Sequence, residues 1–469
     1  MTQGRPRRIA VLGAGLTGLA AAFGLRPRAG QGRQPLPQVV VFESSSRVGG
    51  KIRTETHDGV TYECGPDSFS AAKPQTLELV KELGLGGELL WPSREHGALF
   101  ILWQGRLRRL PEGLDQGVPT RWWPVLRSDL LTWKGKLRLA SEPLRPPLDG
   151  EGDESVAAFF ARRLGAEAAQ RLAEPLWAGA GDPAALSLRS ACPRFAEMEK
   201  RGGLLREARR GPRLPEARVT LRPGLSALPE ALARRLPAGC LRLGAAVTRL
   251  ARRNADWEVR TAAGAETFDT VISALPAPAL APAVEGLDCE LAGVLREIPH
   301  AGSVTVTLAY ERRDFPHPLD GGGFLVPRGE GRALAAAAFT SSQFPSRAPA
   351  ALVLLRGLLG GAGCPEEAAG DDALAARTAR SELRDILGLG DLHPRWTRVA
   401  RWPQGQPQYT VGHALRLRRL ESCLRSYPGL ILAGQSYRGA GLADCVRSGK
   451  LAAAQALSGA AGRAPSGVA

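Results

Sequence analysis

The sequence predicts an α/β protein built on a Rossmann-like dinucleotide-binding domain that is discontinuous along the chain. Two observations predict this fold. A glycine-rich turn joins an apolar strand to a helix within residues 8–25, and another strand, glycine-rich turn and helix lie within residues 429–457. Because both turns must meet in one domain, we expect the residues between them to form an inserted α+β substrate domain and a helical, membrane-associating insert.

This arrangement divides the chain into five segments. Residues 1–90, 213–284 and 405–469 are expected to form the three parts of the cofactor-binding domain. Residues 91–212 have a mainly helical pattern and are expected to form the helical insert and a wall of the substrate site. Residues 285–404 carry strand patterns such as SVTVTLAY and ALVLLRGLLGG, which predict a substrate-binding sheet.

The first turn lies in the stretch VLGAGLTGLA, between the strand candidate RRIAVL and the helix-forming stretch LTGLAAAFGL. Gly13 permits the turn, Gly15 lets the backbone approach a pyrophosphate, and Gly18 allows the helix to pack closely on the strand. The N–H groups and dipole at the start of a helix stabilise phosphates. We therefore expect the cofactor to contact Gly13, Ala14, Gly15, Leu16, Thr17 and Gly18.

The next predicted strand, QVVVFE, ends in Glu43. An acid at this position holds a ribose hydroxyl in dinucleotide-binding folds and disfavours a 2′-phosphate. A solvent-exposed glutamate at the end of a strand is the alternative, but the preceding glycine motif favours the cofactor role.

The stretch SSSRVGGKIRT follows at once and resembles the R-x-G-G motif of flavoproteins of the amine oxidase and protoporphyrinogen oxidase superfamily. YECGPDSF resembles the flavin-side loop of that superfamily, and GLILAGQSYRGAGLADCVRSGK resembles its C-terminal flavin motif. The resemblance implies noncovalent FAD. It adds these cofactor-binding residues: Ser44, Arg47, Gly49, Gly50, Lys51, Gly65, Pro66, Asp67, Ser68, Val247, Trp402, Gly434, Gly441, Leu442 and Ala443.

Within the superfamily the chain is most similar to the protoporphyrinogen oxidase family, through GFLVP, FPSRAP, RWPQGQPQYTVGH and the C-terminal motif. The resemblance implies a six-electron oxidation of a porphyrinogen in haem synthesis, with molecular oxygen as acceptor. The flavin is the electron sink, so no catalytic acid or base is expected from the protein. The resemblance implies these substrate-binding residues: Trp177, Gly323, Phe324, Leu325 and Leu358.

Two positions depart from the family pattern. Leu99 stands where relatives carry a basic residue that pairs with a substrate propionate, so Arg106, Arg108 or Arg109 is a candidate replacement. Trp177 stands where relatives have a glycine, which puts in doubt a backbone contact with the macrocycle. The substrate is therefore protoporphyrinogen IX or the more carboxylated coproporphyrinogen III, and the sequence does not separate them.

Composition excludes several classes of function. The net charge is +16, but only seven of 62 basic residues are lysine, and no basic run is interleaved with aromatic residues at a recognition spacing, so we expect no nucleic-acid partner. Seven scattered cysteines and six histidines lack the spacing of a metal site, and they are typical of a reducing, cytoplasmic location. We expect no transmembrane helix and no secretory leader.

A peripheral membrane contact is predicted by the stretch PTRWWPVLRSDLLTWKGKLRL, which interleaves Trp122, Trp123 and Trp133 with basic residues. The same tryptophans could instead belong to the core or to a substrate wall. A homodimer is left open.

Two other functions are compatible with the scaffold. One is an amine oxidase or a carotenoid desaturase, although Cys445 does not lie in the glycine-flanked motif that attaches flavin covalently. The other is a non-catalytic binding protein, such as the dissociation inhibitors of prenylated small GTPases, which share the scaffold without using FAD. The complete cofactor motifs favour an enzyme.

Overall fold

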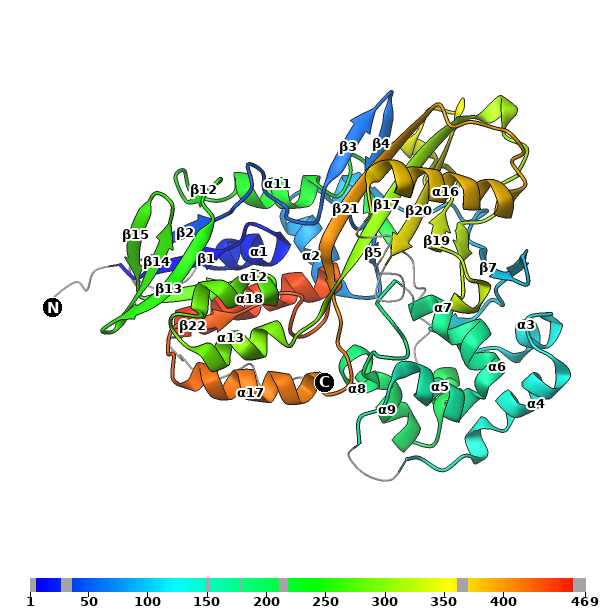
Figure 1. Ribbon diagram of the computed structural model, residues 1–469, viewed down its shortest axis with the longest axis horizontal. Helices are drawn as coiled ribbons and strands as arrows, with labels where there is room; N and C mark the ends of the chain where they lie inside the picture. The colour runs from blue at the N-terminus through cyan, green and yellow to red at the C-terminus, as the bar shows by residue number, and fades with distance from the viewer. Residues whose placement is uncertain are drawn as a thin grey trace.

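The computed structural model describes residues 6–26, 36–148, 152–177, 179–210, 218–360 and 370–458. Figure 1 shows three parts: an α/β part around β1 and α1, an antiparallel-rich sheet that carries α16, and a helical insert around α5. Residues from both ends of the described chain meet in the first part, where α1 and α18 lie side by side.

The α/β part is built on a five-stranded parallel sheet, in the order β12-β2-β1-β16-β22. Side chains alternate between its faces: Ile9 and Val11 of β1 join one hydrophobic cluster, and Ala10 and Leu12 join another. Both faces are therefore covered, as is usual for parallel sheets. The strands are β1 (Arg8–Leu12), β2 (Gln38–Phe42), β12 (Leu241–Arg242), β16 (Thr270–Ser273) and β22 (Leu430–Leu432).

Helices cover one face of this sheet, and helices with a small antiparallel sheet cover the other. On the first face lie α1 (Leu16–Gly24), α2 (Pro74–Glu82), α11 (Ala227–Arg234) and α18 (Leu442–Ser458). On the second lie α12 (Ala277–Val284), α13 (Cys289–Arg296), α17 (His413–Arg425), β13 (Val247–Arg253), β14 (Asp256–Thr261) and β15 (Gly264–Phe268). The Rossmann-like α/β fold predicted from the two glycine turns is confirmed.

The second part is a seven-stranded sheet, in the order β21-β17-β20-β19-β18-β7-β8. One face packs on α16, and the hairpin β3–β4 covers part of the other face at the β17–β20–β21 end. The elements are β3 (Thr54–His57), β4 (Val60–Glu63), β7 (Leu99–Trp103), β8 (Arg106–Arg109), β17 (His300–Glu311), η4 (Arg312–Asp314), β18 (Gly323–Leu325), η5 (Arg328–Glu330), β19 (Leu334–Ala338), α14 (Thr340–Gln343), η6 (Pro345–Arg347), β20 (Leu352–Gly360), α16 (Asp372–Leu387) and β21 (Trp396–Pro407).

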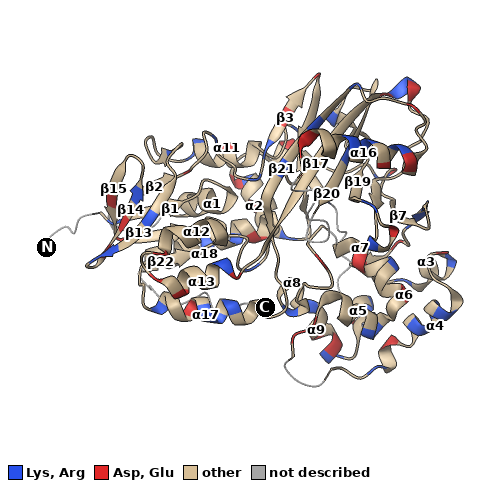
Figure 2. Ribbon diagram, in the orientation of Figure 1, with Lys and Arg blue, Asp and Glu red and all other residues tan. Residues whose placement is uncertain are grey.

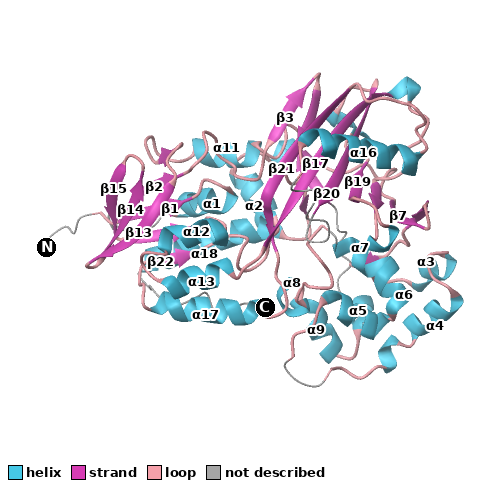
Figure 3. Cartoon of the chain, viewed as in Figure 1, coloured by secondary structure: helices cyan, strands magenta, loops and turns pink. Residues whose placement is uncertain are grey.

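The third part is the helical insert (Figure 3). It has its own hydrophobic core. Its elements are β9 (Leu114–Asp115), β10 (Val118–Pro119), α3 (Trp122–Arg127), α4 (Trp133–Ala140), η2 (Glu142–Leu144), α5 (Val156–Leu164), α6 (Ala166–Ala168), the π-helix η3 (Ala169–Ala173), α7 (Glu174–Trp177), α8 (Leu188–Ala191), α9 (Pro193–Lys200) and α10 (Leu204–Arg210). A small sheet packs against the cluster on the first face of the α/β part, and a short helix precedes one of its strands: β5 (Phe69–Ser70), β11 (Arg218–Leu221), β6 (Leu89–Leu90) and η1 (Gly86–Glu88).

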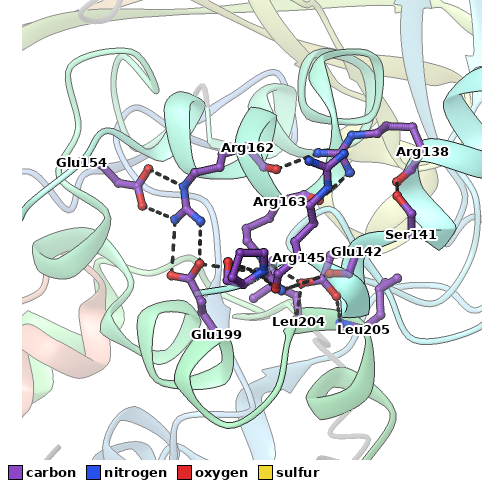
Figure 4. Close-up of polar contacts among 11 residues, drawn as sticks. Arg138, Ser141, Glu142, Arg145, Glu154, Arg162, Arg163, Glu199, Leu204 and Leu205 are labelled. Atoms are coloured by element: carbon purple, nitrogen blue, oxygen red, sulfur yellow. Dashed lines mark hydrogen bonds and ion pairs between the residues drawn. The ribbon is translucent and has the colours of Figure 1, made fainter. Parts of the chain in front are cut away.

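A buried ion pair holds the insert together (Figure 4). The side chains of Arg163 and Glu142 are 1% and 0% exposed, and Arg163 Nε donates to Glu142 Oε1 at 2.8 Å. The carboxylate of Glu142 also accepts from the backbone N–H groups of Leu204 and Leu205, at 2.9 and 3.2 Å. This carboxylate therefore joins η2, α5 and the start of α10.

A second ion cluster lies beside the first in Figure 4. The Arg162 guanidinium donates to Glu199 Oε1 at 2.6 Å and to Glu154 Oε1 at 2.5 Å. These contacts tie α5 to α9 and to the segment before α5. The insert is thus cross-linked by charged side chains as well as by its apolar core.

The structure differs from the expected segments in two places. β7 and β8 lie within residues 91–212, yet they extend the seven-stranded sheet through the pairing of β7 with β18. α13 lies within residues 285–404, yet it packs in the same cluster as α12 of the α/β part. Both elements pair with distant segments, which a local pattern does not reveal; the 212/213 boundary lies outside the described residues.

Candidate functional site

The first glycine turn brings backbone close to backbone. Gly13 has a φ of +96°, and a Cβ on Gly18 would lie 1.9 Å from the carbonyl oxygen of Gly13. A Cβ on Gly15 would have no neighbour within 4 Å, and Gly15 caps α1 without a side-chain hydrogen bond. The turn is therefore closed towards the protein and open in front of the α1 N-terminus, which suits a phosphate group.

Glu43 is buried at the end of β2 and faces this turn. Its Oε2 accepts from the N–H of Ala14 at 2.7 Å, and its Oε1 accepts from the N–H and hydroxyl of Ser45, both at 2.9 Å. The Ser44 hydroxyl lies 3.3 Å from the same oxygen. The carboxylate thus holds the glycine turn in place, and it has lone pairs left for a ribose hydroxyl.

The second glycine loop crosses the first in direct backbone contact. The N–H of Gly49 donates to the carbonyl of Ala14 at 2.8 Å, and a Cβ on Gly50 would lie 3.2 Å from the Cα of Gly15. This close approach, together with a φ of +57° at Gly50, favours glycine at position 50. The two glycine motifs therefore form one backbone surface.

The Arg47 side chain folds back onto its own loop. Its guanidinium donates to the carbonyl oxygens of Val48 and Ile52, both at 3.1 Å, and to that of Gly50 at 2.6 Å. Burial lowers the pKa of Arg47 from its ordinary value. The expected positive charge is present, but its donors hold the loop backbone.

Lys51 and Gly65 bring the second glycine loop to the loop of residues 64–68. A Cβ on Gly65 would lie 1.9 Å from the carbonyl oxygen of Lys51. The Lys51 ammonium donates to the carbonyl of Gly405 in β21 at 2.5 Å, and burial lowers its pKa to about 8. Lys51 therefore links the cofactor loops to the seven-stranded sheet.

The remaining members of the 64–68 loop are Pro66, Asp67 and Ser68. The Ser68 hydroxyl donates to Asp67 Oδ1 at 2.7 Å. Although burial favours its neutral form, the Arg356 and Arg218 guanidinium groups hold the pKa of Asp67 below its ordinary value. The loop therefore carries a fixed negative charge beside the sheet.

Trp402 was expected to approach the flavin. Its indole N–H donates to the carbonyl of Cys64 at 2.7 Å, and its ring lies 3.7 Å from the position of a Cβ on Gly65. Trp402 thus contacts the loop that the family resemblance predicts to lie beside the flavin.

The C-terminal turn lies between β22 and α18. Gly434 has a φ of +113°, and its N–H donates to the Ser448 hydroxyl at 2.9 Å. A Cβ on Gly449 would lie 2.3 Å from the carbonyl oxygen of Thr17, so α18 packs directly on α1. Leu442 and Ala443 begin α18, as predicted, directly after Gly441. Sequence reasoning missed Gly449, whose only signal is a glycine inside a predicted helix.

Val247 is the remaining predicted cofactor residue, and His300, which was not predicted, starts β17. Val247 starts β13, two residues after Ala245, whose N–H donates to the carbonyl of Glu43 at 2.8 Å. His300 donates through Nδ1 to the carbonyl of Ile298 and accepts through Nε2 from the Ser436 hydroxyl, both at 3.1 Å. Burial lowers the pKa of His300 to about 4, so the ring is neutral at physiological pH.

Strand register assembles an open floor on the seven-stranded sheet. Leu99, Gly323, Ala338 and Arg356 are cross-strand partners in one row over β7, β18, β19 and β20. The adjacent row on the same face, two residues along each strand, comprises Ile101, Leu325, Ala336 and Leu358. We call these eight residues the open floor; six of them are partly exposed, whereas Ile101 and Gly323 are buried. Its centre consists of glycine and alanine, so no bulky side chain rises from it.

The predicted substrate residues occupy different places on this sheet. Gly323, Leu325 and Leu358 belong to the open floor. Phe324 points to the other face, where it is 0% exposed and its ring lies 6.1 Å from that of Phe339. A substrate on the floor does not reach Phe324, because strand neighbours alternate between faces.

Trp177 belongs to the core of the insert. It is 7% exposed, and its ring centroid lies 6.4 Å from that of Phe160 and 6.5 Å from that of Phe195. Its carbonyl accepts from the N–H of Ala180 at 2.7 Å. Leu325 of the open floor packs against the same cluster, so the insert adjoins the floor along β18.

The basic residues near Leu99 lie on the edge strand. Arg108 pairs with Asp129 of the insert at 2.8 Å, and Arg109 pairs with Glu112 at 2.9 Å. Arg106 lies opposite Trp103 at the end of the β7–β8 hairpin. None of the three shares the row of Leu99.

Residues 16–457 match the protein family described as flavin containing amine oxidoreductase. The chain is 32% identical to the coproporphyrinogen III oxidase of Bacillus subtilis (strain 168), over 97% of this chain and 99% of the relative. It is 33% identical to the protoporphyrinogen oxidase of Homo sapiens, over 96% and 98%. A crystal structure from Exiguobacterium sp. 255-15, of a protein assigned as a protoporphyrinogen oxidase, aligns with a TM-score of 0.84 at 30% identity, covering 96% of this chain and 99% of that one.

Proposed function

Since the chain belongs to the flavin-containing amine oxidoreductase family, we propose that it is an oxygen-dependent porphyrinogen oxidase of haem biosynthesis. The observation that carries the proposal is the open floor, an apolar face of Gly323, Ala336 and Ala338 between Leu325 and Leu358. Such a face fits a planar macrocycle, and the relatives named for porphyrinogen oxidation align over nearly their whole length.

The cofactor in this proposal is FAD. The closed positions at Gly18 and Gly50 and the open position at Gly15 fit a pyrophosphate, and Glu43 fits a ribose hydroxyl. When bound, FAD supplies the acceptor for a hydride from the substrate in each of three two-electron steps, and three O2 are reduced to three H2O2. In this proposal the residues of the chain bind FAD and the substrate and orient them toward each other.

We propose that the FAD is noncovalent. Burial raises the pKa of the Cys445 thiol to about 11, so it is not a thiolate near neutral pH and is a poor nucleophile. Acid precipitation should release all the flavin into the supernatant. Flavin that stays with the precipitated protein contradicts this.

The assay that tests the function uses both porphyrinogens under air. We expect porphyrin fluorescence and peroxide from coproporphyrinogen III, protoporphyrinogen IX or both. Turnover of an amine or a carotenoid with neither porphyrinogen favours another oxidase on this scaffold. A colourless protein that does not take up FAD favours a binding protein.

A floor variant sharpens the assay. Leu358→Trp should fill the open floor and remove porphyrinogen turnover while the flavin remains bound, because Leu358 lies on the floor and is not a residue of the glycine loops. Leu415→Trp, at a position of α17 that is 58% exposed, is the matched control. Unchanged turnover in Leu358→Trp would move the substrate elsewhere.

The propionate partner is tested at the edge strand. Arg106→Ala and Arg108→Ala, made singly, should raise the KM if either residue replaces the basic group absent at Leu99. Because Arg108 already pairs with Asp129, Arg106 is the better candidate. Unchanged KM values for both porphyrinogens would exclude both residues as partners of the propionate.

We also propose a peripheral contact between the insert and an anionic membrane, in a cytoplasmic protein. No helix among the described residues is both long and apolar enough to cross a bilayer. The insert exposes large apolar side chains beside the basic residues of α3 and α4, which Figure 2 shows in blue. They are Trp123, Leu126, Trp133, Leu137, Leu144 and Leu148.

Vesicle sedimentation tests this contact. The protein should bind vesicles that contain phosphatidylglycerol, and binding should weaken in salt and in Trp123→Ser/Trp133→Ser. Equal binding by the double variant removes the proposal. The chain could act as a monomer or as a homodimer, and analytical ultracentrifugation of the holoprotein distinguishes the two.

A further inference from the structure

Three adjacent strands of the seven-stranded sheet hold the 64–68 loop. The Thr305 hydroxyl of β17 donates to the carbonyl of Cys64 at 2.8 Å, and the Trp402 indole of β21 donates to the same oxygen at 2.7 Å. The Arg356 guanidinium of β20 donates to the carbonyl of Gly65 and, at 3.0 Å, to Asp67 Oδ2. We call Thr305, Arg356 and Trp402 the three-strand clamp.

Arg356 belongs to both sites. It is the one charged residue of the open floor, two positions from Leu358 on the same face of β20. Its side chain is 14% exposed, and both terminal nitrogens point to the 64–68 loop. Leu358 faces the proposed substrate, so one strand holds a substrate contact and a cofactor-loop contact side by side.

The 64–68 loop has little freedom on its other side. Gly65 is pressed against the carbonyl of Lys51, where a Cβ would lie 1.9 Å from the oxygen. The loop is thus held between the second glycine loop and the clamp. A shift of β20 must move Gly65, and a shift of Gly65 must move the backbone of the glycine loops.

Among the clamp residues, Arg356 makes the strongest attachment. Hydrogen bonds donated by a charged guanidinium, here to a carboxylate and to a backbone carbonyl, are stronger than neutral hydrogen bonds. The Thr305 and Trp402 contacts are neutral and share one acceptor. Loss of Arg356 therefore removes both polar contacts between β20 and the loop.

We propose that Arg356 is a positioning residue that couples the cofactor site to the open floor, so that a ligand at either site strengthens binding at the other. Coupling of this kind is reciprocal, because each ligand stabilises the same arrangement of loop and strand. The substrate half of the inference rests on the proposed function, whereas the cofactor half does not.

The test titrates the full-length apoprotein with FAD, with and without coproporphyrin III or protoporphyrin IX as a non-reacting occupant of the floor. In the wild type, porphyrin should lower the Kd for FAD by a factor of about 5 or more, within the usual range of coupling. In Arg356→Gln the factor should fall towards one, and the Kd for FAD should rise about tenfold. Arg356→Lys keeps the charge and should restore part of both.

Arg398→Gln is the matched control, because Arg398 lies on β21 and contacts His57 instead of the 64–68 loop. It should keep the wild-type coupling factor. A residue that only stabilises the fold would weaken both ligands without changing that factor. A wild-type factor in Arg356→Gln therefore overturns the proposal.

The two proposals fail in different ways. If neither porphyrin binds the wild type, the proposed function is what fails, and FAD binding alone decides the role of Arg356. An unchanged Kd for FAD in Arg356→Gln then overturns it. If Arg356→Gln does not fold, Asp67→Asn, which keeps the side-chain volume and removes the anion that pairs with Arg356, carries the same measurements.

Discussion

The α/β part with its glycine loops, which we call the cofactor part after its proposed ligand, and the helical insert are held together by different means. In the cofactor part, backbone touches backbone: Gly18 faces the carbonyl of Gly13, Gly65 faces that of Lys51, and Gly449 faces that of Thr17. In the insert, charged side chains cross from one helix to another, and the pair of Arg163 with Glu142 is almost completely buried.

This difference explains why the contacts of the cofactor part could be predicted from the sequence and those of the insert could not. Close backbone contact excludes a Cβ, so the positions that make it are glycines. Their fixed spacing forms a motif that can be recognised in the sequence. An ion pair such as Arg163–Glu142 joins residues of ordinary surface type. Nothing nearby in the sequence marks them as buried.

The largest effect should come from the cofactor part. Gly18→Ala places a methyl group 1.9 Å from a carbonyl oxygen, so we expect a loss of about 3 kcal/mol or more and a protein without flavin. Gly15→Ala, where nothing lies within 4 Å, should keep the apoprotein Tm and weaken only the binding of FAD. Thermal unfolding measures the Tm of each variant, FAD titration measures its Kd, and Gly293→Ala in α13 serves as the control. Equal apoprotein Tm values for Gly18→Ala and Gly15→Ala would contradict the packing argument.

The next effect should come from the insert. Glu142→Gln removes the carboxylate that Arg163 bonds and leaves Glu199, 3.6 Å away, as its remaining anion. The cost should therefore stay below the roughly 3–5 kcal/mol of a fully unpaired buried charge. We expect the insert to become sensitive to limited proteolysis while flavin stays bound. Glu197→Gln breaks an exposed pair with Lys200 and should change stability by no more than about 1 kcal/mol. Loss of flavin together with the insert would show that the two parts unfold as one.

Acid should weaken the contact between β17 and the α/β part through His300. The pKa of His300 is lowered from 6.5 to about 4 by burial, so between these values the unfolded chain binds a proton that the folded chain does not. Stability therefore falls as the pH drops from 6.5 to 4. His300→Gln should flatten the Tm profile in this window. A parallel profile in the variant would assign the acid sensitivity to other groups.

The smallest effect should come from the surface of the insert. Leu144 is 85% exposed in the same short helix that buries Glu142. Leu144→Ser should therefore change the free energy of unfolding by less than about 0.5 kcal/mol, as measured by urea denaturation. A change of 2 kcal/mol would mean that Leu144 packs against something in the folded protein.

The placement of the substrate residues shows where sequence reasoning stops. The resemblance grouped Gly323, Phe324 and Leu325, but alternation along β18 puts Phe324 in the core beside Phe339. Ala336, Ala338 and Arg356 joined the open floor only through pairing with distant strands. Small residues inside strands carry no signal of their own.

By itself, the sequence determined the cofactor part: its strands, its three glycine turns and the acid at Glu43, because phosphate binding and close packing impose local spacing. Only the tertiary structure decided that Arg47 holds its own loop, that β7 and β8 belong to the seven-stranded sheet, and that Arg356 joins the floor to the 64–68 loop. The physical reason is the range of the contacts. A turn is made by neighbours in the chain, whereas a floor is made by register between strands that the chain brings together only when it folds.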